Sequence, residues 1–176
     1  LKQQQAVIEL ATAQLKNGHV FNKLVQEHQI QLGTRFLQPW SSWITPKTPS
    51  VSSKRFDSLF FVAQMPDGQL ATHDEQEVTQ SVWLNPTKAL EQYWAGEVEL
   101  APPQIMTLAE LSHFNSPTEV LKKAQEKTFA VVQPEPIDIE GARWLCYPGD
   151  PMHSRAQAVL MGPSRLGWRN KRFEPI

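Results

Sequence analysis

Three carboxylates, Asp74, Glu75 and Glu77, form an acidic run between two apolar stretches of the chain. A hard cation such as Mg²⁺ prefers oxygen ligands, and a carboxylate can also act as a general base toward water. A lone carboxylate holds Mg²⁺ poorly, because the ion keeps most of its water unless several oxygens replace it. Acidic runs are also typical of solvated loops. The residue types leave a catalytic role and a solvated loop both open.

A second group of residues is suited to binding a phosphorylated or aromatic ligand. Arg55 begins an apolar stretch, where its guanidinium could bind phosphate in a two-pronged manner, and Trp43 could stack on a nucleobase. The alternatives are that Arg55 pairs with Asp57 or a neighbouring loop, and that Trp43 packs the edge of a sheet. Gln104 is a further candidate for a substrate contact, although the prolines before it are also typical of a helix start.

Other catalytic patterns are missing from the sequence. The five histidines show no zinc-binding spacing, and the chain has no G-x-S-x-G motif, P-loop or G-x-G-x-x-G motif. The single cysteine, Cys146, cannot form a disulfide within the chain and has the apolar neighbours of a small buried hydrophobe. The tail 165–173 mixes basic and aromatic residues, which suits RNA but is more typical of a terminal strand with a solvated face.

Composition is that of an ordinary globular domain. The chain has 176 residues, 40% of them hydrophobic and 20% charged, with a net charge of −1. This charge gives no electrostatic case for nucleic acid or an anionic membrane, and no apolar run is long enough to cross a bilayer. The cysteine content favours a cytoplasmic location. The chain begins with Leu1 rather than Met, so organelle targeting stays open.

The elements that position these residues divide at Pro39, the first proline of the chain. Residues 1–30 show helical spacing of apolar residues and predict two helices, the first ending at Gly18. The stretch 55–65 is apolar on both faces, which predicts a central strand covered on two sides. Further elements follow: a strand at 80–84, helices at 86–95, 103–113 and 117–126, and strands at 129–132, 143–147 and 156–161. This order predicts the α+β class.

Three signatures in this body resemble, in order, the second half of a Nudix hydrolase. They are WSSWITP at 40–46, KRFDSLFF at 54–61, and Glu77 followed by WLNP at 83–86 and LAPPQ at 100–104. The resemblance is to the Nudix hydrolase 19-like, coenzyme A diphosphatase-like branch of the family. It implies a partial Nudix-type α/β/α sandwich with a mixed sheet, preceded by a helical insertion. A single domain is expected over 1–176, with the insertion at 1–35, core elements at 36–127 and C-terminal strands at 128–176.

The resemblance also implies an activity and a set of site residues. Nudix enzymes hydrolyse a diphosphate linkage with Mg²⁺ or Mn²⁺, and coenzyme A (CoA) or an acyl-CoA is the favoured substrate class. Glu77 would be a metal ligand or base, and the substrate-binding residues would be Arg55, Trp43, Gln104 and Asp57. The expected partner is a small nucleoside-diphosphate derivative such as CoA. Binding to a membrane is not expected, binding to nucleic acid is disfavoured, and formation of a homodimer stays open.

The catalytic signature of the family, G-x5-E-x7-R-E-U-x-E-E-x-G-U (U a bulky apolar residue), fits no stretch of this sequence. We therefore expect the chain to supply substrate-side residues of a longer enzyme and to be inactive alone, because one glutamate cannot hold the metal. The alternative is a Nudix-like module without this box that binds a nucleotide or a protein without catalysis.

Overall fold

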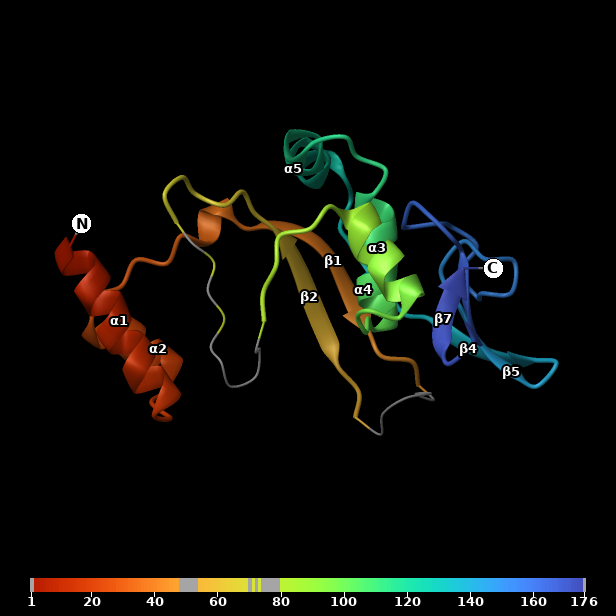
Figure 1. Ribbon diagram of the computed structural model, residues 1–176, viewed down its shortest axis with the longest axis horizontal. Helices are drawn as coiled ribbons and strands as arrows, with labels where there is room; N and C mark the ends of the chain where they lie inside the picture. Colours follow the sequence, from red (N-terminus) through yellow and green to blue (C-terminus); the bar gives the residue numbers. More distant parts are fainter. Residues whose placement is uncertain (1, 48–53, 70, 72, 74–79, 176) are drawn as a thin grey trace. The chain divides into compact units, whose positions relative to one another are not determined.

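The computed structural model describes residues 2–47, 54–69, 71, 73 and 80–175 (Figure 1). The chain forms two compact units, one up to Phe36 and one from Leu37 onward. Each unit has its own helices, and both sheets belong to the second.

The first unit contains the two predicted helices. Helix α1 (Lys2–Lys16) is followed by Gly18 at φ 86°, a left-handed conformation that glycine adopts readily and that ends the helix as predicted. Helix α2 (Phe21–Glu27) and a short 3₁₀ turn, η1 (Thr34–Phe36), complete the unit. Of the side chains described in this unit, only Ala11 and Leu24 are buried.

A mixed three-stranded sheet lies in the second unit. Its strands are β1 (Gln38–Ile44), β2 (Asp57–Val62) and β3 (Ala130–Val132), in the order β2-β1-β3. Strand β1 is antiparallel to β2 and parallel to β3. Residues 40–43 of β1 are all buried, so β1 is the strand covered on both faces.

The prediction of a central strand at 55–65 is wrong in its position. The strand there is shorter, Asp57–Val62, and it ends the described sheet, with Leu59 and Phe61 exposed. The sequence suggested burial on both faces because apolar residues occur on both faces of this stretch. The central position belongs instead to β1, where Ser41 and Ser42 are buried despite their polarity.

Three helices lie between β2 and β3 in the chain, and their ends match the local signals. They are α3 (Pro86–Ala95), α4 (Pro102–Leu111) and α5 (Pro117–Glu126), each with proline in its first turn. Asn85 caps α3 by accepting a hydrogen bond from the backbone N–H of Thr87 at 2.9 Å, and Gly96 at φ 82° ends it. The predicted helices at 86–95, 103–113 and 117–126 are confirmed, within two residues at each end.

A second sheet is formed by the C-terminal strands. It is an antiparallel meander of β4 (Glu135–Ile139), β5 (Ala142–Cys146), β6 (Arg165–Arg169) and β7 (Arg172–Pro175). The predicted strands at 129–132 and 143–147 are confirmed as β3 and β5, and the tail forms strands as expected. Strand β4 was not predicted.

Two predicted strands are wrong. Residues 80–84 are described but form no strand, and Val82 and Trp83 are exposed there. Residues 156–161 form bends and irregular backbone, although Val159 and Leu160 pack against the core. An apolar stretch can therefore be buried, or left exposed, without the backbone pairing that defines a strand.

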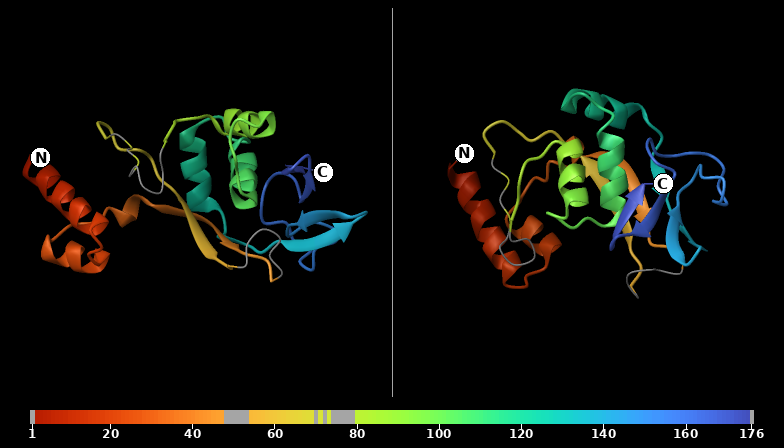
Figure 2. Two further views of the ribbon diagram at one scale, coloured as in Figure 1. Left: turned by 60° about the horizontal axis from the view of Figure 1, so that its bottom comes forward. Right: turned by 45° about the vertical axis from the view of Figure 1, so that its right-hand side comes forward.

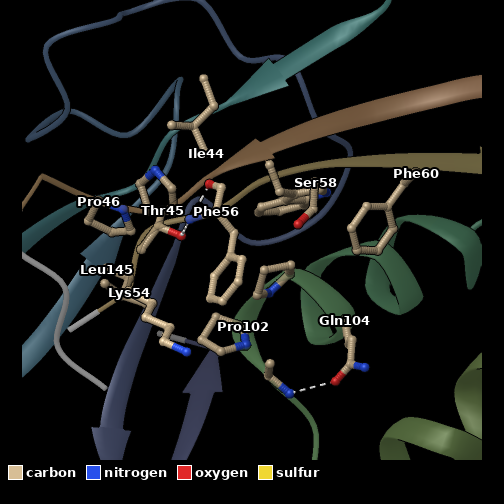
Figure 3. Close-up of a pocket in the computed structure, with 14 residues that line it drawn as sticks. Ile44, Thr45, Pro46, Lys54, Phe56, Ser58, Phe60, Pro102, Gln104 and Leu145 are labelled. Atoms are coloured by element: carbon tan, nitrogen blue, oxygen red, sulfur yellow. Dashed lines mark hydrogen bonds between the residues drawn. The ribbon is translucent and has the colours of Figure 1, made fainter. Parts of the chain in front are cut away.

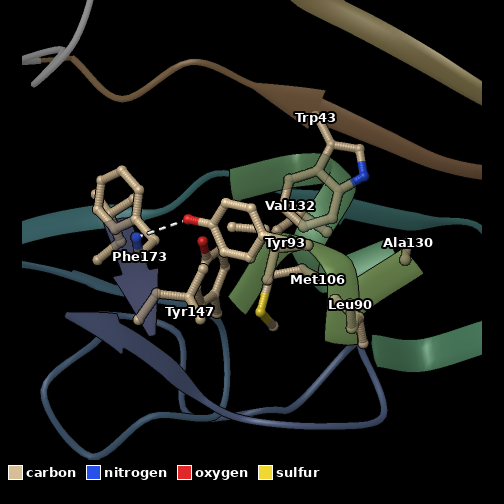
Figure 4. Packing of buried hydrophobic residues seen from close by; sticks show 11 residues of the cluster. Trp43, Leu90, Tyr93, Met106, Ala130, Val132, Tyr147 and Phe173 are labelled. Atoms are coloured by element: carbon tan, nitrogen blue, oxygen red, sulfur yellow. Dashed lines mark hydrogen bonds between the residues drawn. The ribbon is translucent and has the colours of Figure 1, made fainter. Parts of the chain in front are cut away.

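The core of the second unit joins both sheets to α3 and α4 (Figures 2 and 4). Trp43 and Val132 of the mixed sheet pack with Met106 of α4, and Tyr147 lies in the same cluster. The hydroxyl oxygen of Tyr93 accepts a hydrogen bond from the backbone N–H of Phe173 at 2.8 Å, which links α3 to β7. The α+β class and the mixed sheet predicted from the sequence are confirmed.

Candidate functional site

A pocket of about 320 Å³ lies where the end of β1, the start of β2 and the start of α4 meet (Figure 3). This volume is near the lower end of small-molecule sites. The pocket is lined by Trp43, Ile44, Thr45, Pro46, Lys54, Phe56, Ser58, Phe60, Ala101, Pro102, Pro103, Gln104, Pro134 and Leu145. It therefore gathers residues of two neighbouring sequence signatures, at 40–46 and 54–61, and of the distant one at 100–104.

The pairing of β1 with β2 places the first two of these signatures side by side. Trp43 lies opposite Ser58 in the register, and Ile44 lies opposite Asp57. Beyond the strand ends, the backbone N–H of Thr45 donates to the carbonyl of Phe56 at 2.9 Å. The Thr45 hydroxyl accepts from the backbone N–H of Phe56 at 2.8 Å and also donates to its carbonyl at 3.2 Å. These bonds fix the backbone of Phe56 at the pocket.

The start of α4 forms the opposite wall. Pro102 and Pro103 occupy the first turn, where a missing N–H costs no helical hydrogen bond. The side-chain carbonyl of Gln104 accepts from the backbone N–H of Ala101 at 2.7 Å, which holds the turn. Figure 3 shows the ring of Phe56 facing Pro102 across the pocket.

The pocket lining is chiefly apolar, and two of its polar groups already have partners. The hydroxyl of Thr45 is bonded to the Phe56 backbone, and the side-chain oxygen of Gln104 is bonded to Ala101. Among the described lining residues only Lys54 carries a charge, and this residue is exposed. The arrangement suits an apolar ligand group with a polar part near Lys54.

Trp43 and Gln104, two of the predicted substrate-binding residues, both line this pocket. Trp43 is only 3% exposed and belongs to the core, where its ring makes edge contacts with Tyr147 and Phe60 at centroid distances of 6.0 and 6.3 Å. Its indole N–H donates to the hydroxyl of Ser41 at 3.0 Å. Trp43 thus supports the pocket wall from the core side.

Arg55 and Asp57 lie next to the pocket residues in sequence but outside its lining. The guanidinium of Arg55 donates to the carbonyl of Thr45 at 3.1 and 3.3 Å. The carboxylate of Asp57 accepts from the hydroxyl of Ser42 at 2.7 Å. These bonds stabilise the pairing of β1 with β2, and the proposed substrate contacts of both residues stay predictions.

The predicted metal ligand and catalytic residue Glu77 lies outside the described residues, as do Asp74 and Glu75. Within the described ranges, no group of three or more His, Cys, Asp or Glu side chains is placed to hold a metal ion. This part of the chain therefore does not fit a Mg²⁺ or Mn²⁺ site by itself.

Two buried ion pairs were not predicted from the sequence. The ammonium of Lys127 lies 3.2 Å from a carboxylate oxygen of Glu110, and the indole N–H of Trp40 donates to the same carboxylate at 2.8 Å. The guanidinium of Arg165 donates to both carboxylate oxygens of Asp150, at 2.7 and 2.8 Å. Both pairs connect residues far enough apart in sequence that no local pattern indicates them.

The Asp150–Arg165 pair changes how two sequence features are interpreted. Residues 147–151 have the residues of a tight turn, but the Asp150 carboxylate is buried and also accepts from the Ser164 hydroxyl at 2.9 Å. The bonds from Arg165, with those from the Met152 backbone and the Ser164 hydroxyl, lower the pKa of Asp150 to about 2 against the opposing effect of burial. Arg165 is one of the basic residues of the tail 165–173. Because it is paired with the buried Asp150, its charge stabilises the fold rather than facing a ligand.

Burial raises the pKa of the Cys146 thiol to about 11, and the nearby Asp150 carboxylate adds to this effect. The residue is a buried free cysteine. A thiol with a raised pKa is a poor nucleophile. The prediction that Cys146 is a small buried hydrophobe is confirmed.

Comparison with known families defines the class of protein to which this fold and pocket correspond. The model of the NUDT19 Nudix domain family matches residues 2–111, so the chain belongs to this branch of the Nudix family. The Nudix resemblance read from the three signatures is confirmed. The α+β architecture with a mixed sheet is consistent with a partial Nudix fold.

Several curated proteins are similar to the chain. The acyl-coenzyme A diphosphatase NUDT19 of Xenopus laevis is 33% identical over 108 residues, 61% of this chain and 28% of that protein. The protein of the same name from Gallus gallus is 26% identical over 151 residues, 74% of this chain and 37% of the relative. The putative nudix hydrolase 7 of Caenorhabditis elegans is 27% identical over 113 residues, 63% of this chain and 38% of that protein.

The matched regions span well under half the length of these relatives. No solved structure matches the chain. Within the described residues, no helix has the length and apolar character needed to span a membrane.

Proposed function

We propose that the complete product of this gene hydrolyses a diphosphate linkage in a nucleoside-diphosphate-linked compound, with CoA or an acyl-CoA as the favoured substrate. The present chain supplies the substrate side of that site. The observation that carries the proposal is the pocket that joins the WITP, KRFDS and LAPPQ segments. The names of the NUDT19 relatives support the acyl-CoA substrate class.

Mg²⁺ or Mn²⁺ belongs to this proposal through the family resemblance. Such an ion neutralises the charge of a diphosphate and lowers the pKa of bound water. In this chain Glu77 is the proposed ligand or general base, and Arg55, Trp43, Gln104 and Asp57 are the proposed substrate-side residues.

The proposal is tested by incubating the complete gene product with CoA, NADH and a sugar nucleotide, each with Mg²⁺, with Mn²⁺ and with a chelator. Cleavage of the CoA diphosphate releases adenosine 3′,5′-bisphosphate and phosphopantetheine, which chromatography separates. Metal-stimulated release of both products is expected. Failure to cleave any of the three diphosphates would reject the proposal.

The role of Glu77 has its own test. Glu77→Gln is expected to lower kcat on the order of 10²-fold, because the variant loses a base or a metal ligand. Glu75→Gln is the matched control, since it removes a neighbouring charge that the family resemblance does not assign to the site. If Glu77→Gln turns over as fast as the control Glu75→Gln, Glu77 does not belong to the catalytic site.

A second candidate function is binding of a nucleotide or protein partner without catalysis. The observation that favours it is the absence of the Nudix catalytic signature from residues 1–176. Binding of CoA measured by calorimetry, with no product in any metal condition, would favour this module over the hydrolase.

A further inference from the structure

We infer that the pocket between β1, β2 and α4 receives the acyl chain of a CoA thioester rather than its nucleobase or diphosphate. This inference rests on the proposed function for the identity of the whole ligand. It assigns one part of that ligand to a site defined by Phe56, Pro46, Pro102 and the residues around them.

The polar groups of the pocket argue against a nucleobase. A base buried here would need hydrogen-bond partners along its edges, and unpaired polar atoms are costly to bury. The Thr45 hydroxyl is bonded to both backbone groups of Phe56 and the Gln104 side-chain oxygen to Ala101, which leaves only the Gln104 side-chain N–H groups and the Ser58 hydroxyl among the polar side-chain groups of the described neutral lining residues. These are too few for the several polar edge atoms of a base. An alkyl chain makes no such demand.

The charges of the pocket argue against a diphosphate. A diphosphate needs several cations or a cluster of backbone N–H donors. Lys54 is the single charged residue among those described in the lining, and Pro102 and Pro103 have no N–H to donate. Lys54 is exposed, so the polar part of a ligand can lie near it while the chain enters the apolar part.

The walls favour an apolar occupant that fits a preformed space. Phe56 is 58% exposed although its ring lines the pocket, so a bound chain would remove apolar surface from water. The opposite wall is fixed by the first turn of α4, and Trp43 is fixed in the core. A preformed site loses less entropy on binding than one that must become ordered.

The first experiment is a chain-length series with the wild-type gene product. The kcat/KM is measured for CoA and for acetyl-, butyryl-, hexanoyl-, octanoyl- and decanoyl-CoA under one metal condition. We expect kcat/KM to rise by up to about fourfold per added methylene until the pocket is full and then to level off, which corresponds to about 0.8 kcal/mol per buried methylene. Equal values for CoA and all the thioesters would overturn the inference while leaving CoA hydrolysis intact.

A pair of variants locates the effect. Phe56→Ser is expected to reduce the octanoyl-CoA to CoA ratio of kcat/KM roughly tenfold, because the chain loses its aromatic wall. Leu59→Ser is the matched control, since Leu59 is similarly exposed at 60%, lies on β2 and does not line the pocket. If this ratio falls equally in both variants, or in neither, the acyl chain binds outside this pocket.

A binding measurement separates failure of this inference from failure of the proposed function. Calorimetric titration with octanoyl-CoA and with CoA, in the presence of a chelator, requires no turnover. Tighter binding of octanoyl-CoA that depends on Phe56 supports the acyl pocket even if no diphosphate is cleaved. Equal affinity for the two ligands overturns it even if CoA is cleaved.

Discussion

The two sheets of the larger unit are built by different kinds of pairing. The mixed sheet joins β1 to β3 in parallel, with Ser41 opposite Ala130, so its strands come from distant parts of the chain. In the C-terminal sheet each strand pairs with the next one along the sequence. The candidate pocket lies mainly against the mixed sheet. The β1–β2 pairing and the first turn of α4 bring the family signatures together, while the C-terminal strands complete the core.

A buried ion pair lies beside each sheet, and the two pairs are bonded differently. Lys127 and Glu110 have side chains only 7% and 3% exposed, and the Lys127 ammonium also lies 3.8 Å from the centre of the Trp40 ring. In the C-terminal sheet the Asp150 carboxylate is buried, but Arg165 is partly open to solvent. The mixed sheet should therefore be more sensitive to loss of its pair.

The largest expected effect is on the pair beside the mixed sheet. Glu110→Gln leaves the buried Lys127 ammonium without a counter-charge and weakens the bond from Trp40, so the free energy of unfolding should fall by about 3–5 kcal/mol. Urea denaturation measures the change. Glu126→Gln is the control, because its pair with Lys122 is exposed at 3.9 Å and is worth less than about 1 kcal/mol. Equal losses would show that burial of the Glu110 pair does not govern stability.

The second prediction concerns the pH dependence of the C-terminal sheet. Folding lowers the pKa of Asp150 from 3.8 to about 2, chiefly through the bonds from Arg165. The resulting stability, about 2.5 kcal/mol, is fully present above about pH 4 and is lost as the pH falls through 2. Asp150→Asn should lower stability at neutral pH and flatten the dependence between pH 4 and 2.

The control for this prediction is Asp138→Asn, since Asp138 pairs with Arg143 on the exposed β4–β5 hairpin. It should cost less than about 1 kcal/mol at neutral pH and leave the acid dependence in place. An unchanged acid profile in Asp150→Asn would mean that other carboxylates control acid unfolding.

The comparison also explains which elements the sequence could predict. The start of α3 at Asn85, its end at Gly96 and the start of α5 at Ser116 depend on residues within one turn. These were predicted correctly. Strand β1 was not predicted, and β2 was placed at the centre of the sheet, because strand position depends on a distant partner such as β3.

The candidate site shows the same difference between features set by nearby residues and features set by distant ones. The family signatures identified Trp43 and Gln104, and both line the pocket. The sequence did not indicate Phe56 as a pocket wall, because its role depends on the distant first turn of α4. Asp150 has the residue type expected in a turn, and only its bond to Arg165 reveals a buried charge.

The smallest expected effect lies where the two sheets meet. The hydroxyl of Tyr147 is buried without a hydrogen-bond partner among the described residues, and burial raises its pKa. Its ring packs against Trp43 of β1. Tyr147→Phe keeps this packing and removes an unpaired polar group, so stability should change by less than about 0.5 kcal/mol or rise slightly.

Tyr93→Phe is the matched variant, because the Tyr93 hydroxyl accepts a bond from the Phe173 backbone at 2.8 Å. Losing that oxygen leaves a buried N–H without its acceptor and should cost about 1–3 kcal/mol. Thermal unfolding of both variants measures the difference. A loss at Tyr147 as large as at Tyr93 would show that its hydroxyl has a partner, and that the junction of the sheets depends on a polar contact as well as on packing.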